Sequence, residues 1–170
     1  MIELKELSAD DGMDVYLMLQ EIPKKENGLM NNANGLSFEE YKEWLRGKYA
    51  ESRQIGLMDG WKVPSTTYWL YVNEEPVGFG TIRHFLTDAL RKAGGHIGYG
   101  IAPSYREKGY GKIILGLLLE EASRLGIDKV LATIQLGNAA SKAVALANGG
   151  IIIEQTDERI YVWIDTVQKS

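Results

Sequence analysis

The chain has 170 residues, of which 45% are hydrophobic and 25% charged, and its formal net charge is −4. This length and balance are typical of one globular domain, so we expect a single domain over residues 1–170. The charge gives no electrostatic reason to expect binding to nucleic acid or to an anionic membrane. Cysteine is absent, which excludes disulfides, thiolate metal ligands and a cysteinyl acyl intermediate, and no metal site is predicted.

The first residues, MIELKELSADDG, lack the basic start and apolar core of a signal peptide. No apolar run reaches the length needed to span a membrane. We therefore expect a cytoplasmic protein.

The first third of the chain predicts one strand, two helices and a long loop. Alternating residues favour a strand over 2–7, after which Ser8 is suited to cap a helix that Pro23 stops. Residues 24–36 have turn composition and predict a long loop. Ser37 and Glu40 form the pattern of a capping box, which predicts a second helix.

From residue 66 the pattern changes to strands. Residues 67–72 and 77–85 predict a hairpin, and a polar stretch over 87–95 separates it from the next strand. The remaining expected elements are a strand over 96–101, a helix over 109–125, a strand over 129–134, a helix over 139–148, and strands over 151–155 and 159–165. This order implies a mixed α/β fold, in which helices cover a mixed sheet.

One segment carries chemistry: a strand, Pro103, the pattern Arg106-x-x-Gly109-x-Gly111, and an amphipathic helix. The first turn of a helix leaves amides without partners, and glycines there let a bulky anion approach. The segment therefore predicts a pyrophosphate site, to which Arg106 and Lys112 add charge. Glycines alone would favour a simple turn, but the combination is more specific, and neither a P-loop nor G-x-G-x-x-G is present.

These residues resemble the hallmark of the GNAT acetyltransferase superfamily, Gln/Arg-x-x-Gly-x-Gly/Ala after the fourth strand. Residues 130–134 resemble the fifth strand of the family, and the similarity covers about residues 66–155. The segments GGHIGYGI and WKVPSTTYWLY are also similar to a bacterial subgroup of predicted acetyltransferases. The resemblance implies a central, mostly antiparallel sheet of about six or seven strands, splayed between strands four and five, with about four helices.

In that family acetyl-CoA occupies the gap between strands four and five. The resemblance implies that the backbone of Tyr99, Gly100 and Ile101 holds the acetyl and pantetheine groups, and that the Ile101 N–H polarises the thioester carbonyl. It assigns Asn138 and Ser141, on the next helix, to cofactor binding. It assigns pyrophosphate binding to the loop residues Arg106, Glu107, Lys108, Gly109, Tyr110, Gly111 and Lys112.

The proton-transfer groups are less well defined by the resemblance. Relatives often place a base near the start of the fourth strand, which favours His96, although a histidine that only packs or hydrogen-bonds there is equally expected. The tyrosine that protonates the leaving thiolate in many relatives corresponds to Ala145, a departure from the pattern. Ser141, Tyr110 or water could replace it.

We therefore expect an acetyl-CoA-dependent N-acetyltransferase in which a primary amine attacks directly in a ternary complex. The alternative is a non-catalytic acyl-CoA-binding or regulatory domain of the same fold. The resemblance places the acceptor pocket near residues 22–36 and near Trp61, Tyr68 and Trp69. It also favours a homodimer through the late strands at 151–153 and 161–164, residues that could equally be sheet core.

Overall fold

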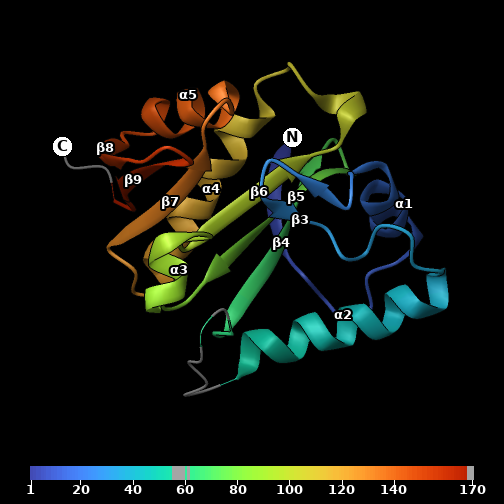
Figure 1. Cartoon of the computed structure of the whole chain (residues 1–170). Coiled ribbons are helices and arrows are strands. Elements are labelled where there is room, and N and C mark those ends of the chain that lie inside the picture. Colours follow the sequence, from blue (N-terminus) through green and yellow to red (C-terminus); the bar gives the residue numbers. More distant parts are fainter. Residues whose placement is uncertain (55–59, 61, 168–170) are drawn as a thin grey trace.

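The structure is a computed structural model that describes residues 1–54, 60 and 62–167 (Figure 1). Its strands form two larger antiparallel sheets and one short hairpin. The first sheet has the order β1-β4-β5-β6, with β1 (Ile2–Glu6), β4 (Ser65–Val72), β5 (Glu75–Arg83) and β6 (Ile97–Ile101). The second has the order β7-β9-β8, with β7 (Lys129–Gln135), β8 (Ile151–Gln155) and β9 (Arg159–Asp165).

Helices cover both faces of the first sheet. One face packs on α1 (Met13–Glu21) and α2 (Phe38–Arg53), and alternate residues such as Trp69 and Phe79 are buried there. The other face packs on α4 (Tyr110–Arg124), against Leu70 and Ile82, in a core that continues into the second sheet and α5 (Ala139–Ala147). None of the helices in the described part of the chain has the length and apolar content that a bilayer crossing requires.

The predicted mixed α/β fold is confirmed, and so is the capping box at the start of α2. The Ser37 Oγ accepts from the Glu40 N–H at 3.1 Å, and the Glu40 carboxylate accepts from the Ser37 N–H at 2.9 Å. The predicted cap at Ser8 is wrong, because α1 begins only at Met13 and Gly12 precedes it. Ser8 instead closes a turn, in which its N–H donates to the Asp11 carboxylate at 2.7 Å.

Two short elements lie where sequence analysis expected irregular chain. The predicted loop at 24–36 contains the hairpin of β2 (Lys25–Glu26) and β3 (Leu29–Met30). Asn27 and Gly28 connect these strands with φ values of 50° and 85°, the backbone of a tight hairpin turn that asparagine and glycine favour. The polar stretch at 87–95 contains α3 (Asp88–Lys92), which begins after the cap residue Thr87.

Buried polar side chains fix the base of this hairpin to the end of α1. Asn31 is 2% exposed, and its Nδ2 donates to the carbonyls of Leu19 and Ile22 at 2.8 and 2.9 Å. Asn34 donates to Ile22 as well, at 3.0 Å. The terminal carbonyls of α1, which have no partners inside the helix, are thereby satisfied without water.

We predict that Asn31→Ala lowers the free energy of unfolding by about 2 kcal/mol, because it leaves buried carbonyls without donors. Asn32→Ala is the matched control, since Asn32 is exposed and should change stability by less than about 0.5 kcal/mol. Urea unfolding of both variants measures the difference. Equal stabilities would show that the Asn31 amide does not hold the base of the hairpin.

Candidate functional site

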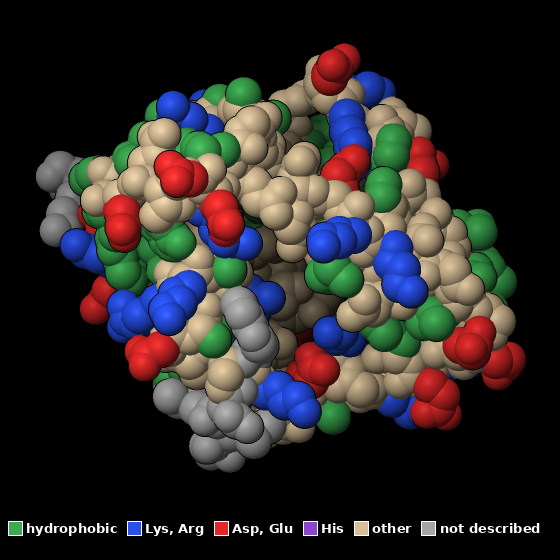
Figure 2. Space-filling model, in the orientation of Figure 1, with side chains coloured by type: hydrophobic (Ala, Val, Ile, Leu, Met, Phe, Trp, Pro, Cys, Tyr) green, Lys and Arg blue, Asp and Glu red, His purple; other side chains and the backbone are tan. Residues whose placement is uncertain are grey.

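The two large sheets meet at one hydrogen-bonded junction. The His96 N–H donates to the Leu131 carbonyl at 2.9 Å, and the Leu131 N–H donates to His96 Nδ1 at the same distance. The Gly94 N–H adds a bond to Thr133 Oγ1 at 2.8 Å. Beyond this junction β6 and β7 belong to different sheets, and Figure 1 shows them diverging toward their C-terminal ends. The space-filling view in the same orientation shows a hollow near the centre of the molecule (Figure 2), and we call this hollow beside β6 and β7 the cleft.

Unpaired main-chain groups line both walls of the cleft. The Ala102 N–H donates to the Val77 carbonyl and the Arg83 N–H donates to the His96 carbonyl. Since antiparallel ladder bonds alternate, the N–H groups of Tyr99 and Ile101 point away from β5 and toward the cleft. On β7 the Leu136 N–H donates to the carbonyl of Glu158, the residue before β9, so the N–H groups of Thr133 and Gln135 face the cleft from the other side. The Gln135 carbonyl accepts from the Asn138 N–H at 3.1 Å.

A series of free amides lies where the cleft is widest. After the 3₁₀ turn η1 (Pro103–Tyr105), Gly109 adopts a φ of 85° and α4 begins at Tyr110. Within the described residues, no protein acceptor binds the N–H groups of Glu107, Lys108, Gly109, Tyr110, Gly111 and Lys112. We call these six groups the amide cradle. Consecutive free amides at the positive end of a helix dipole bind phosphate-like anions.

Gly111 leaves the cradle open. A Cβ built on this residue would lie 3.6 Å from Val144 Cγ2 and 3.8 Å from Tyr99 Cε2, which are ordinary contact distances. The fold itself would therefore accept alanine here, whereas a longer side chain would meet Val144 and Tyr99 and would crowd the first turn of α4. The residues present thus fit a diphosphate group at this position.

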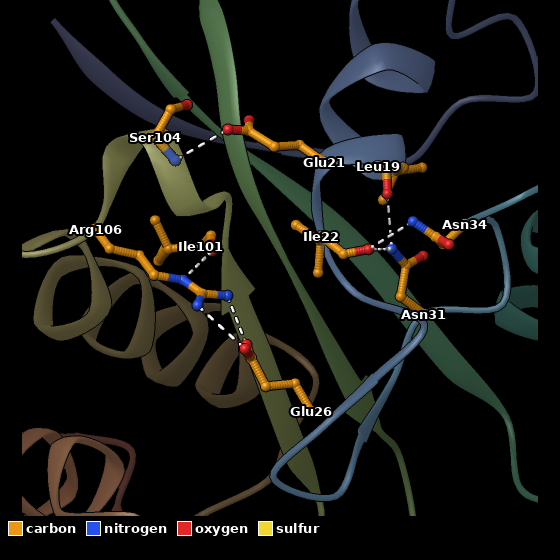
Figure 3. Close-up of polar contacts among 9 residues, drawn as sticks. All are labelled: Leu19, Glu21, Ile22, Glu26, Asn31, Asn34, Ile101, Ser104 and Arg106. Atoms are coloured by element: carbon orange, nitrogen blue, oxygen red, sulfur yellow. Dashed lines mark hydrogen bonds and ion pairs between the residues drawn. The ribbon is translucent and has the colours of Figure 1, made fainter.

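Arg106, which was predicted to add charge to the pyrophosphate site, is bound by protein groups in the structure. Its guanidinium binds both oxygens of the Glu26 carboxylate, at 2.5 and 3.2 Å, and its Nε donates to the Ile101 carbonyl at 2.9 Å (Figure 3). Its own N–H donates to the Pro103 carbonyl at 3.3 Å. The charge and the amide of Arg106 are therefore both engaged by protein groups, and the residue links the cradle loop to β2.

The start of α5 lies beside the cradle and beside Tyr99 of β6. Asn138 caps this helix, since its Oδ1 accepts from the Ser141 N–H at 3.2 Å. Tyr99 lies against Gly111; burial raises the pKa of the Tyr99 hydroxyl, and the neighbouring Ser141 side chain lowers it by a smaller amount. Ala145 is 2% exposed and belongs to the core beneath α5. The position that departs from the expected tyrosine therefore faces the core.

His96 lies at the closed end of the cleft, with 7% of its surface exposed. Its Nδ1 accepts the Leu131 N–H, so the neutral ring carries its proton on Nε2. Burial lowers the pKa of His96 to about 4, and the positive charges of Arg91 and Arg83 act in the same direction. This arrangement supports the structural alternative that sequence analysis weighed beside the catalytic one, and the role of base stays a prediction.

Two of the three aromatic residues predicted near the acceptor, Tyr68 and Trp69, are buried in the core. Trp69 is 0% exposed and donates from Nε1 to the Asp11 carboxylate at 2.7 Å, beneath α1 and α2. Tyr68 is buried on the opposite face of the sheet. Trp61 lies outside the described residues. Figure 2 shows a hollow near the centre of the surface, with charged side chains around its rim.

Sequence analysis placed residues 22–36 near the acceptor pocket but expected a loop there, and it missed the β2–β3 hairpin that this segment forms. Its residues Glu26 and Leu29 contact the loop after β6 and the backbone of β6 itself. The signal that could have found it was the Asn27-Gly28 pair, which is typical of two-residue hairpin turns. Its strands have only two residues each, too few to show alternation.

The sequence profile of the Acetyltransferase (GNAT) family matches residues 31–149. This is more than half of the chain, and it includes β4 to β7, α4 and the amide cradle. The chain therefore belongs to the GNAT acetyltransferase family. No curated protein matches it significantly by sequence.

Solved structures with the same fold are distant in sequence. RimL, a ribosomal L7/L12 alpha-N-protein acetyltransferase in complex with coenzyme A, aligns with a TM-score of 0.70 at 18% identity, covering 98% of this chain and 96% of that one. PseH, an N-acetyltransferase of Campylobacter jejuni in complex with acetyl coenzyme A, aligns with a TM-score of 0.60 at 16% identity. The alignment covers 97% of this chain and 99% of that one. A GNAT acetyltransferase of Streptococcus pneumoniae aligns at 0.64 and 16% identity, covering 96% and 97%.

We predict that the His96 ring makes stability pH-dependent. Because the folded pKa of about 4 lies below the ordinary value near 6.5, the unfolded chain takes up the proton first. Stability is complete above pH 6.5 and falls by up to about 3 kcal/mol as the pH drops to 4. In His96→Asn the amide oxygen can replace Nδ1 as the acceptor but does not titrate, so this loss should be absent.

Urea unfolding at pH 7.5 and pH 4.5 measures the effect. His96→Ala is the comparison, because it leaves the Leu131 N–H without an acceptor and should cost about 2 kcal/mol more than His96→Asn at pH 7.5. Equal costs for the two variants would contradict the structural role of Nδ1.

Proposed function

We propose that this protein transfers an acetyl group from acetyl-CoA to a primary amine. The observation that carries the proposal is the amide cradle at the wide end of a cleft whose two walls present unpaired main-chain groups. A linear, amide-containing ligand with a diphosphate at one end would satisfy both sets of groups at once. Membership of the GNAT family supports the same activity.

Each part of the site has a proposed partner in acetyl-CoA. The amide cradle binds the diphosphate, and Lys112, at the first turn of α4, adds positive charge. The main chain of Tyr99 and Ile101 holds the pantetheine and acetyl groups from the β6 side, whereas Gly100 between them has its own N–H and carbonyl directed at β5. Asn138, the N-cap of α5, and Ser141 complete the binding surface. Arg106 acts indirectly, by holding the cradle loop against β2.

Acetyl-CoA supplies an activated acyl group as a thioester, and the chain supplies orientation and polarisation. The Ile101 N–H, which has no ladder partner, donates to the thioester carbonyl and stabilises negative charge there. The amine attacks directly in a ternary complex, which agrees with the absence of cysteine. An amine with an ordinary pKa near 10.4 must first lose a proton, and either His96 or water accepts it.

The acceptor itself belongs to a broad class. RimL is an alpha-N-protein acetyltransferase, which makes a protein amino group one candidate, and a small-molecule amine is the other. Neither nucleic acid nor membrane has a part in the proposal. The cytoplasmic location expected from the sequence stays a prediction.

A second candidate function is acyl-CoA binding without turnover. Two observations favour it: the expected tyrosine position carries the buried Ala145, and the lone pair of His96 Nδ1 is engaged by the Leu131 N–H. A coenzyme thiol with a pKa like that of cysteine, about 8.5, is already a tolerable leaving group, so the missing acid would slow the reaction without abolishing it. Catalysis therefore remains our first proposal.

We predict that the wild type binds acetyl-CoA in calorimetric titration and that Gly111→Glu weakens this binding at least about 100-fold, because a carboxylate would then face the diphosphate. Gly47→Glu is the matched control, since Gly47 lies on α2 with open space around it and its variant should bind normally. Release of free thiol in the presence of an amine panel then separates a transferase from a domain that only binds. No binding by the wild type would refute both functions.

We also propose that the chain forms a homodimer through β8. This strand is the outer edge of its sheet, and Ile151, Ile152 and Ile153 are 67%, 39% and 53% exposed. These isoleucines are therefore not sheet core, and an apolar edge strand is suited to pairing with a second copy. Light scattering should give a dimer for the wild type and a monomer for Ile151→Lys/Ile153→Lys. A monomeric wild type would contradict the proposal.

A further inference from the structure

Leu29, on β3, lies directly on the backbone of β6. A Cβ built on Gly100 would lie 2.6 Å from Leu29 Cδ2, and one built on Gly98 would lie 3.5 Å from Leu29 Cδ1. Only a residue without a side chain at position 100 permits this contact. Both glycines flank Tyr99, whose N–H lines the cleft, so Leu29 lies immediately beside that wall.

The hairpin reaches across the cleft to its second wall. A Cβ built on Gly28, at the hairpin turn, would lie 3.1 Å from Nε2 of Gln135, which is on β7. The hairpin therefore passes from β6 to β7 on the face of the sheet that α1 and α2 cover. On the opposite face, Tyr99, α4 and α5 bound the same space.

Polar contacts on both sides hold the hairpin in this position. Figure 3 shows Glu26 directed toward the Arg106 guanidinium and Glu21, at the end of α1, directed toward the Ser104 N–H, which it binds at 3.0 Å. The base of the hairpin is fixed by Asn31 and Asn34. Since its base and one of its strands are both tied down, Leu29 cannot withdraw without breaking several hydrogen bonds.

We propose that Leu29 limits the length of the acyl group that the cleft accepts. This inference rests on the proposed function, in which the acyl group lies beside the main chain of Tyr99 and Ile101. In that position β6 and β7 enclose it laterally, Tyr99 and α5 enclose it on one face, and Leu29 encloses it on the other. An acetyl group ends at one methyl carbon, whereas a butyryl group carries two further carbons into the volume of the Leu29 side chain.

The chain offers two closely matched variants for a test. Leu29→Ala removes three side-chain carbons from the wall, while Leu29→Phe extends it. Met30→Ala is the control, because Met30 is the next residue of the same strand and is 51% exposed. It removes a comparable side chain from the hairpin without changing the wall.

The experiment is calorimetric titration of each protein with CoA, acetyl-CoA and butyryl-CoA, so that no acceptor is needed. We expect the wild type and Met30→Ala to bind butyryl-CoA at least tenfold more weakly than acetyl-CoA. In Leu29→Ala this ratio should fall by about tenfold or more while the affinity for CoA itself stays the same. Leu29→Phe should lower the affinity for acetyl-CoA relative to the affinity for CoA. If Leu29→Ala does not fold, this change in Leu29→Phe is the test of the inference.

Two results would overturn the inference: equal affinities for acetyl-CoA and butyryl-CoA in the wild type, or the same ratio in Leu29→Ala as in the wild type. Both leave the proposed function intact, because they require CoA binding. Failure of the wild type to bind any of the three ligands would instead refute the proposed function, and the role of Leu29 with it.

Discussion

Two hydrogen bonds between His96, just before β6, and Leu131 on β7 join the two large sheets, and the cleft depends on this connection. One bond is between main-chain groups, and in the other the His96 ring nitrogen accepts the Leu131 N–H. If the ladder continued past it, the two strands would satisfy each other and no unpaired groups would remain for a ligand. Because the ladder stops, the N–H groups of Tyr99 and Ile101 on one wall, and those of Thr133 and Gln135 on the other, keep no ladder partner. Buried main-chain groups are costly to leave unpaired, so such an edge is stable only where water or a ligand can reach it.

The same connection gives His96 a structural role, whereas its role as the base stays a prediction. The ring replaces a carbonyl as acceptor for the Leu131 N–H, and its burial against that strand lowers its pKa to about 4. Because Nδ1 accepts the Leu131 N–H, its lone pair is not available to take a proton from a substrate. The amide cradle does not depend on a side chain in this way, because the start of α4 supplies free N–H groups through backbone geometry alone.

The strands of the two larger sheets and the four longer helices followed from local patterns in the sequence. Apolar alternation, the Ser37 and Glu40 capping box and the two glycines around Tyr110 are all properties of neighbouring residues, and they predicted β4 to β9, α2 and α4 to within a few residues. The same local pattern pointed to the segment that holds the amide cradle, and its binding of a diphosphate stays a prediction. Ser8 misled the prediction because a residue suited to cap a helix can equally close a turn.

What the sequence could not show depends on contacts between distant residues. Arg106 meets Glu26 across 80 positions, and this pairing turns a predicted anion-binding side chain into a structural link. Leu29 meets Gly100 only because α1 ends where the Asn31 and Asn34 amides can bind it. Trp69 was expected near the acceptor, but the aromatic residues of α2 and the Asp11 carboxylate bury it instead.

The cradle and the walls of the cleft recognise their ligand through N–H groups, which every residue except proline possesses. A site of this kind places few demands on side-chain identity, so most of its residues are free to change over evolutionary time while the backbone keeps its path. The solved structures compared above share 16% to 18% identity with this chain at TM-scores of 0.60 to 0.70. Chains that differ at most of their positions can therefore share one fold, because a site built from N–H groups depends on the path of the backbone.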